Sequence, residues 1–100
     1  MDENAKRVSD LFRELSEARK SASDLKGLIG QFGISFGGPQ WDCVTTEEVF
    51  AAFSSSRLSE MSREEFESFI PSVCDFLGLS FEKVLYRNNF QANGYRVHLL

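Results

Sequence analysis

The sequence predicts a mainly helical single domain that ends in a β-hairpin. Three observations lead to this fold class: a long stripe of apolar residues at helical spacing, two capping-box motifs in the middle of the chain, and an Asn-Gly pair near its end. The chain has 100 residues, which corresponds to one domain. Hydrophobic residues make up 42% of it, with ten Phe, so a packed core is expected and disorder is not.

The N-terminal stripe repeats at alternating gaps of three and four residues. It consists of Val8, Leu11, Leu15, Ala18, Ala22, Leu25, Ile29 and Phe32. The spacing predicts one amphipathic helix over 3–26, which should end between Gly27 and Gly33 because each glycine costs a helix about 1 kcal/mol. This seam would cover the chain's own core, or would form a coiled coil with a second copy or another protein. As an assembly seam its contacts would be Val8, Leu11, Leu15, Ala18, Ala22 and Leu25.

A stretch without charge, residues 27–41, follows the helix. Within it, Gly37-Gly38-Pro39 is typical of a turn and lacks the GxxxxGK[ST] pattern of a phosphate-binding loop. We therefore divide the chain into a heptad helix over 1–33, a Gly/Pro linker over 34–43 and a C-terminal unit over 44–100. Trp41 is predicted to anchor the core rather than to stack on a ligand.

Two capping boxes, Thr45-x-x-Glu48 and Ser62-x-x-Glu65, predict the starts of two helices. In each box the hydroxyl accepts a hydrogen bond from a backbone N–H, and the Glu reaches back to the cap residue. The apolar spacing after each box predicts that these helices end near residues 53 and 77.

The second of these helices contains a proline and is followed by a glycine. Pro71 lacks a backbone N–H and should kink the helix or split it in two. Gly78 can adopt the left-handed conformation that ends many helices, so we expect the helix to stop there.

The C-terminal segment contains Asn93-Gly94, a strong signal for a two-residue hairpin turn. With that turn, Phe90 would lie opposite Val97 and one face of the hairpin would be apolar. The other face would be polar and basic, with Arg87, Asn89, Gln91, Arg96 and His98. A helix over 80–88 is the competing prediction for the first strand.

Charge is distributed unevenly along the chain. The net charge is −4; residues 42–76 hold eight acids and two bases, and residues 77–100 hold one acid and three bases. This balance argues against a general nucleic-acid coat protein and against a membrane-surface binder, both of which need excess Lys and Arg. Any contact with nucleic acid should involve the C-terminal end first.

The residue types that carry chemistry are sparse. Cys43 and Cys74 lie far apart without a CxxC motif, which argues against a disulfide scaffold or a zinc site and indicates a reducing compartment, the cytoplasm or nucleus. His98 is the single histidine, and no His, Cys or Asp lies near it in sequence at metal-ligand spacing. We find no nucleophile arrangement, signal peptide or membrane-length apolar run. The expectation is a non-enzyme with no cofactor, no metal, no small-molecule substrate and no membrane contact.

The predicted order of helix, linker, helix, turn, helix and hairpin is that of a winged helix-turn-helix. Three segments carry the similarity: Val44-Thr-Thr-Glu-Glu-Val-Phe50, Met61-Ser-Arg-Glu-Glu-Phe66, and a wing of Lys83-Val-Leu-Tyr-Arg87 with Gly94-Tyr-Arg-Val-His98. Residues 44–100 resemble the winged helices at the C-terminal ends of viral and phage primase–helicases and of replicative helicases. The resemblance implies a winged-helix-like domain preceded by a long amphipathic helix.

The second helix of this motif departs from the DNA-reading members of the family. In those members it enters the major groove and carries Arg, Lys, Asn or Gln. Here it carries Glu64, Glu65 and Glu67, an acidic face better suited to docking a protein than to phosphate. The resemblance assigns contacts with a partner or nucleic acid to the wing residues Lys83, Arg87, Asn89, Arg96 and His98.

These observations favour a non-enzymatic interaction module that docks or assembles within a nucleic-acid-handling complex, as in replication or transcription regulation. Its partner would be another protein or a second copy in a homodimer. One alternative is direct DNA or RNA binding through the basic wing, which would weaken with salt. Another is an acidic viral or phage inhibitor that mimics nucleic acid and competes for a basic partner.

Overall fold

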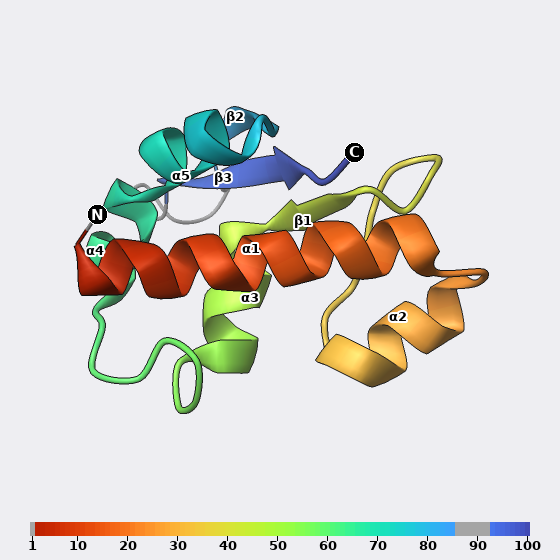
Figure 1. Ribbon diagram of the computed structural model, residues 1–100, viewed down its shortest axis with the longest axis horizontal. Coiled ribbons are helices and arrows are strands. Elements are labelled where there is room, and N and C mark those ends of the chain that lie inside the picture. The colour runs from red at the N-terminus through yellow and green to blue at the C-terminus, as the bar shows by residue number, and fades with distance from the viewer. Residues whose placement is uncertain (1, 86–92) are drawn as a thin grey trace.

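Helices and a small antiparallel sheet form one mixed α/β domain in the computed structural model, which describes residues 2–85 and 93–100. In chain order the elements are α1 (Glu3–Ser21), α2 (Leu25–Phe32), β1 (Cys43–Thr45), α3 (Thr46–Phe53), α4 (Arg63–Ser68), α5 (Ile70–Leu77), β2 (Ser80–Leu85) and β3 (Asn93–His98) (Figure 1). The long N-terminal helix and the C-terminal hairpin agree with the predicted fold class. Strand β1 is an addition to it, so the hairpin is part of a three-stranded sheet.

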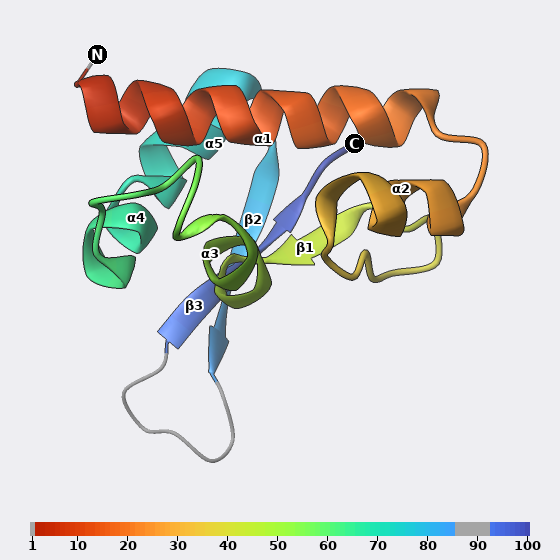
Figure 2. The same ribbon diagram turned by 90° about the horizontal axis from the view of Figure 1, so that it is seen from below.

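Helix α1 runs along one side of the molecule, with the sheet and the shorter helices beneath it (Figure 2). Asp2 caps its N-terminus, since the Asp2 Oδ1 accepts a hydrogen bond from the Asn4 N–H at 2.7 Å. Arg19 and Lys20 lie in its last turn, where positive charge is favourable to the helix dipole. The apolar stripe faces inward, because burying it against the other elements contributes most of the helix's stability.

The single helix predicted over 3–26 is wrong, since α1 ends at Ser21 and α2 begins at Leu25. Ala22 is extended, and the Asp24 carboxylate accepts the Gly27 N–H at 2.6 Å, which caps a new helix. The break turns α2 relative to the stripe, so that α2 buries Leu28. Gly33, in the left-handed conformation with φ 70°, ends α2.

The predicted linker over 34–43 contributes to the core. Ile34 and Phe36 are 4% and 5% exposed, and the Ser35 N–H donates to the Glu48 carboxylate of α3 at 3.2 Å. Trp41 packs partly buried against the core, with the Arg19 guanidinium 5.6 Å above its ring. The segment therefore belongs to the same packed unit as the helices on either side of it.

Both capping boxes begin helices as predicted through the hydroxyl half of each box, whereas the Glu48 carboxylate accepts the Ser35 N–H rather than reaching back to Thr45. The Thr45 hydroxyl accepts the Glu48 N–H at 3.3 Å, and the Ser62 hydroxyl accepts the Glu65 N–H at 3.0 Å. The helix predicted to end near residue 77 is split into α4 and α5, with Pro71 in the first turn of α5.

Glycine at 78 ends α5 as expected. Its φ is 72° and its N–H donates to the carbonyls of Cys74 and Asp75. The chain then turns directly into β2, so this one residue sets where the sheet begins relative to α5.

Strand β3 lies in the middle of the sheet, between β1 and β2, and both pairings are antiparallel. Ser80–Leu85 is a strand, so the competing helix over 80–88 is not formed there. The predicted register is also wrong: Val97 lies opposite Phe81 and Gly94 opposite Val84, so Asn93 and Gly94 belong to β3 rather than to a two-residue turn. The connection between the strands, 86–92, lies outside the described residues.

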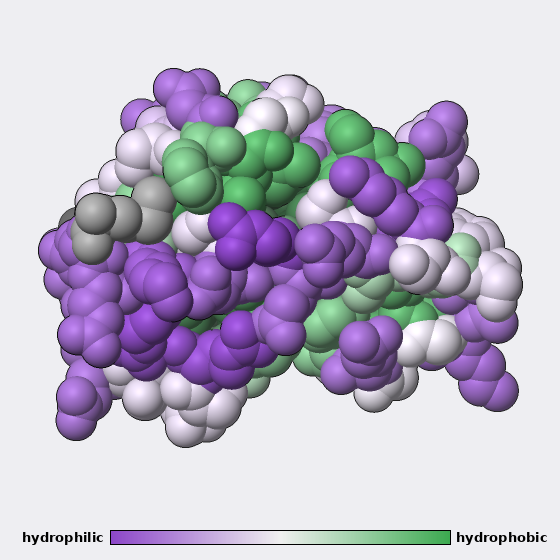
Figure 3. Space-filling view, viewed as in Figure 1, coloured by the Kyte–Doolittle hydropathy of each residue, from purple (hydrophilic) through white to green (hydrophobic). Residues whose placement is uncertain are grey.

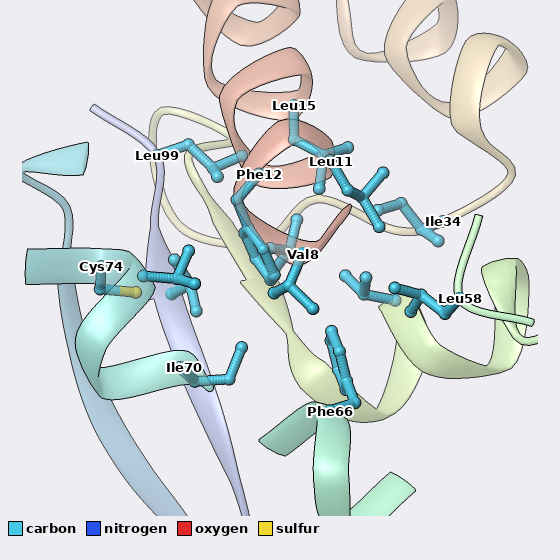
Figure 4. Close-up of a cluster of buried hydrophobic side chains, with 14 of the residues drawn as sticks. Val8, Leu11, Phe12, Leu15, Ile34, Leu58, Phe66, Ile70, Cys74 and Leu99 are labelled. Carbon is cyan, nitrogen blue, oxygen red and sulfur yellow. The ribbon is translucent and has the colours of Figure 1, made fainter. Parts of the chain in front are cut away.

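One continuous core joins segments from both ends of the chain (Figure 4). Side chains from α1, from the 34–36 segment and from the elements beyond converge in it. The members with no exposed surface are Val8, Leu11, Phe12, Leu15, Val49, Leu58, Phe66, Ile70, Val73, Cys74, Val97 and Leu99. The described chain therefore folds around a single core rather than as a helix linked to a separate unit.

Two hydrogen bonds, one buried and one partly buried, connect the sheet to the helices. The Ser16 hydroxyl of α1 donates to the Leu99 carbonyl at 2.6 Å, and the Thr46 hydroxyl of α3 accepts the Tyr95 N–H at 2.9 Å. None of the described helices has the length and apolar character needed to cross a membrane.

Candidate functional site

A cysteine and a histidine from distant parts of the sequence meet on the outer face of the sheet. Cys43 begins β1 and His98 ends β3, and the two residues are cross-strand partners. The Cys43 Sγ lies 3.1 Å from the His98 Nδ1. Sequence spacing could not reveal this pair, because the residues are 55 positions apart and only the strand pairing brings them together.

Two carboxylates flank the pair. The Asp42 Oδ1 lies 3.8 Å from the Cys43 Sγ, and the Glu82 Oε1 lies 3.9 Å from the His98 Nε2. The same Glu82 oxygen accepts a hydrogen bond from the Arg96 guanidinium at 2.7 Å. Thiol, imidazole and carboxylate groups thus form one cluster, and the two carboxylates approach it from opposite sides.

The cluster borders a surface depression of about 400 Å³. The loop containing Gly37 and Gly38 forms one wall, and Gly37 is held to Cys43 by two backbone hydrogen bonds of 2.8 and 3.1 Å. Gly38 has a φ of 85°, and a Cβ there would lie 3.0 Å from the Asp42 Oδ1 and 3.1 Å from the Cys43 Sγ. Glycine at this position therefore lets the loop approach the cluster without filling it.

The environment of Cys43 favours the protonated thiol. Partial burial raises the pKa of Cys43, and the neighbouring Asp42 carboxylate raises it further. Since the thiolate is the reactive form of cysteine, the cluster does not resemble an activated nucleophile. It has instead the mixed sulfur, nitrogen and oxygen ligands typical of metal binding.

The predicted wing residues do not share one face. Arg96 and His98 lie on the outer face with Glu82, which forms an ion pair with Arg96. Lys83 is exposed but lies on the opposite side of its strand, the side of Phe81, because neighbouring residues of a strand point to opposite faces. Arg87 and Asn89 lie outside the described residues.

The predicted acidic face is only partly available at the surface. Glu64 is exposed and Glu65 is half-buried in the first turn of α4. Glu67 is 17% exposed and forms a 2.8 Å ion pair with Arg63 one turn earlier. The three carboxylates therefore do not present a uniform negative surface.

The predicted assembly seam is mostly covered within the chain. Val8, Leu11 and Leu15 have no exposed surface, so they are core residues and cannot contact a partner without unfolding. The other seam positions, Ala18, Ala22 and Leu25, are partly buried against the same core. Within α1 the stripe is regular because it lines the core, whereas its continuation into α2 includes Ile29, which is exposed.

An apolar surface that sequence analysis did not single out lies where α5 meets β2. Phe76 is 63% exposed there, and Leu77 and Leu79 are partly buried beside it. Figure 3 shows apolar side chains gathered over α5 and the start of β2. In the sequence Phe76 fits the inward spacing of its helix, so its exposure follows from the position of α5 and not from any local motif.

A shallow groove of about 190 Å³ adjoins this surface. Leu77 and Leu79 form its apolar part, and Arg13, Glu17 and Lys20 of α1 line its other side. An apolar strip bordered by charges of both signs is a common form of protein-binding surface.

The second cysteine plays no part in either surface. Cys74 has no exposed surface, and burial, with a smaller effect of Asp75, raises its pKa to about 11.

Comparison of the chain with protein-family models, with curated proteins and with solved structures gives no match.

Proposed function

We propose that this chain is a non-enzymatic, winged-helix-like docking module that binds another protein through the surface formed by Phe76, Leu77 and Leu79. The exposure of Phe76 is the observation that carries the proposal. An aromatic side chain with 63% of its surface in water is unfavourable in the isolated chain and becomes favourable when a partner covers it. The groove beside it suits a segment with an apolar anchor and flanking charges.

The order of elements supports the winged-helix-like part of this proposal. Helix α1, the 33–42 segment, helix α3, the α4–α5 pair and the β2–β3 strands follow the order that the resemblance implies, with α2 and the short strand β1 as additions to it. In that arrangement α4–α5 corresponds to the helix that reads DNA in DNA-binding winged helices. Its exposed residues include Glu64, Asp75 and Phe76, and acidic and apolar groups favour a protein over phosphate.

The basic residues of the sheet also favour a protein partner. Arg96 is engaged by Glu82, and Lys83 lies on the other side of its strand. Since phosphate binding depends on clustered and uncompensated positive charge, direct DNA or RNA binding is the less supported alternative. The nucleic-acid-handling complex remains part of the proposal through the family resemblance.

Site-specific photo-crosslinking in cells of the source organism tests the proposal. A photoreactive phenylalanine analogue replaces Phe76 in one variant and, as the matched control, Ile29 in another, because Ile29 is also an exposed apolar residue at 41%. The expected result is a discrete protein adduct from position 76 that is absent from position 29. Identical adducts at both positions, or none at position 76, would contradict the proposal.

A binding assay with a mixed-sequence DNA duplex and an RNA strand separates the alternative. We expect the fluorescence anisotropy of the labelled DNA and of the labelled RNA to stay unchanged when the chain is added, even at low ionic strength, where electrostatic binding is strongest. Binding that decreases with salt and is lost on Lys83→Glu with Arg96→Glu would favour the nucleic-acid alternative instead.

A further inference from the structure

We propose that Cys43, His98 and Asp42 bind a divalent transition-metal cation such as Zn²⁺ at the outer face of the sheet. The Cys43 Sγ, the His98 Nδ1 and an Asp42 carboxylate oxygen all lie within 4.8 Å of one another. Thiolate, imidazole and carboxylate are the ligand types that zinc uses in proteins. This inference does not depend on the docking proposal, because the cluster and the Phe76 surface share no residue.

The distances within the cluster are close to those of a tetrahedral site. With zinc–sulfur bonds of about 2.3 Å and zinc–nitrogen or zinc–oxygen bonds of about 2.0–2.2 Å, neighbouring ligand atoms are about 3.4–3.6 Å apart. The Sγ–Nδ1 distance is 3.1 Å and the Sγ–Oδ1 distance is 3.8 Å. These two distances differ from the tetrahedral values by a few tenths of an ångström, and the third, between the His98 Nδ1 and an Asp42 carboxylate oxygen, is within 4.8 Å.

The backbone holds two of the ligands in place before any cation binds. Cys43 and His98 are fixed as cross-strand partners, and the Asp42 carbonyl accepts the Leu99 N–H at 2.7 Å, which continues the pairing past the strand ends. Cys43 also makes two backbone hydrogen bonds with Gly37 on its other side. A site whose ligands are positioned by a sheet loses little conformational entropy on binding.

Glu82 lies near the ring nitrogen of His98 that faces away from Cys43. Its carboxylate oxygen is 3.9 Å from the His98 Nε2, beyond hydrogen-bond distance, and its negative charge favours the tautomer with the proton on that nitrogen. The lone pair is then on Nδ1, the nitrogen that faces Cys43. Arg96, hydrogen-bonded to the same carboxylate, fixes its position.

The surroundings leave room for a fourth ligand. The depression of about 400 Å³ opens beside Cys43 and His98, and the absence of a side chain at Gly38 keeps that space clear. Three protein ligands and one open position, filled by water, is an arrangement that zinc accepts. On binding, the Cys43 thiol loses its proton to solvent and bonds to the cation as thiolate, while neutral His98 and ionised Asp42 bind directly.

Cobalt absorption spectroscopy tests the site, because Co²⁺ bound to a thiolate in tetrahedral geometry gives a charge-transfer band and intense visible bands. The reduced chain is titrated with Co²⁺ and then with Zn²⁺. We expect both sets of bands for the unmodified chain and for Cys74→Ser, followed by their loss as Zn²⁺ displaces Co²⁺. Absence of the charge-transfer band, or its loss in Cys74→Ser, would overturn the proposal.

Ligand variants identify the residues involved. Cys43→Ser should lose the charge-transfer band, and His98→Gln should weaken Zn²⁺ binding by more than the roughly 10–100-fold that loss of a supporting partner costs. Glu82→Gln should weaken it by about 10-fold. Circular dichroism of each variant confirms that the fold is retained. A folded Cys43→Ser that keeps the band, or a folded His98→Gln that binds Zn²⁺ as tightly as the unmodified chain, would contradict the assignment.

Discussion

The two faces of the β1–β3–β2 sheet differ in character: residues next to each other along a strand belong to the apolar core on one face and to a polar cluster on the other. On the inner face, Val44 and Val97 are buried and contribute to the single core. On the outer face, one position away along the same strands, Cys43 and His98 meet beside Glu82. The inner face stabilises the strand register, and that register places the outer residues within bonding distance of one another.

This contrast shows why the outer cluster can tolerate polar and titratable groups. The inner face removes apolar surface from water, which is the main contribution to stability. The outer residues are half-buried or exposed and contribute little to the stabilisation that comes from burying apolar surface. Substitutions on the two faces should therefore differ strongly in their effect on unfolding.

The largest expected effect is that of Leu15→Asp, which removes an inward contact of α1 above the sheet. Leu15 has no exposed surface, so the new carboxylate would be buried without a partner and should destabilise the chain by about 4 kcal/mol or more. Ile29→Asp is the matched control, since Ile29 belongs to the same sequence stripe but is exposed. Circular dichroism during urea unfolding measures both; a Leu15→Asp chain as stable as Ile29→Asp would show that α1 is not core.

A pH effect comes next, from Cys74 in the same core. Burial raises its pKa from 9.0 to about 11, so between these values the folded chain keeps a proton that the unfolded chain has lost. Stability should therefore fall as pH rises through this window, by about 2–3 kcal/mol in total. In urea unfolding at a series of pH values, the free energy of unfolding should fall more steeply with pH for the unmodified chain than for Cys74→Ala. Parallel plots of this free energy against pH would show that folding does not raise the pKa of Cys74.

A pair of neighbours on β3 then compares the two faces directly. Val97→Ala removes buried methyl groups from the inner face and should cost about 2 kcal/mol in the free energy of unfolding. The midpoint of urea unfolding gives the value. A cost below about 0.5 kcal/mol would mean that the inner face is not tightly packed.

The smallest effect belongs to Arg96→Ala, on the outer face next to Val97. The Arg96–Glu82 ion pair is exposed, with 45% and 52% of the side-chain surfaces in water, so its loss should cost less than about 0.5 kcal/mol. A double-mutant cycle with Glu82→Ala isolates the pair. Coupling larger than about 1 kcal/mol would place the outer cluster among the elements that stabilise the fold.

Local sequence signals predicted the local structure well. Thr45 and Ser62 begin helices, Pro71 divides one and Gly78 ends it, because each acts on hydrogen bonds within a few residues of itself. Asp24 is the counterexample: its cap separates α1 from α2, although the apolar spacing continues across the break. The prediction placed the end of the helix among the glycines that follow, because the apolar spacing carries no information about the Asp24 cap.

Signals that depend on distant segments were not accessible from the sequence. In the prediction Asn93-Gly94 set the hairpin register and placed Phe90 opposite Val97. In the structure Phe81 lies opposite Val97, a shift of nine positions, and Lys83 and Arg96 lie on opposite faces. The Cys43–His98 pair depends on β1, a three-residue strand with no sequence signature of its own. The exposure of Phe76 likewise depends on how α5 is oriented in the whole fold.

Disulfide trapping tests the central claim, that the strand register brings residues 43 and 98 together. In a Cys74→Ser background, His98→Cys should allow Cys43 to form a disulfide on mild oxidation, because facing Cα atoms of antiparallel strands are about 4.5–5.5 Å apart and disulfides span about 4.4–6.8 Å. Arg96→Cys is the control, since Arg96 lies opposite Thr45. Mass spectrometry of the oxidised monomers should find the intramolecular bond in His98→Cys and not in Arg96→Cys. No bond in His98→Cys, or equal bonding in both variants, would contradict the register and the site built on it.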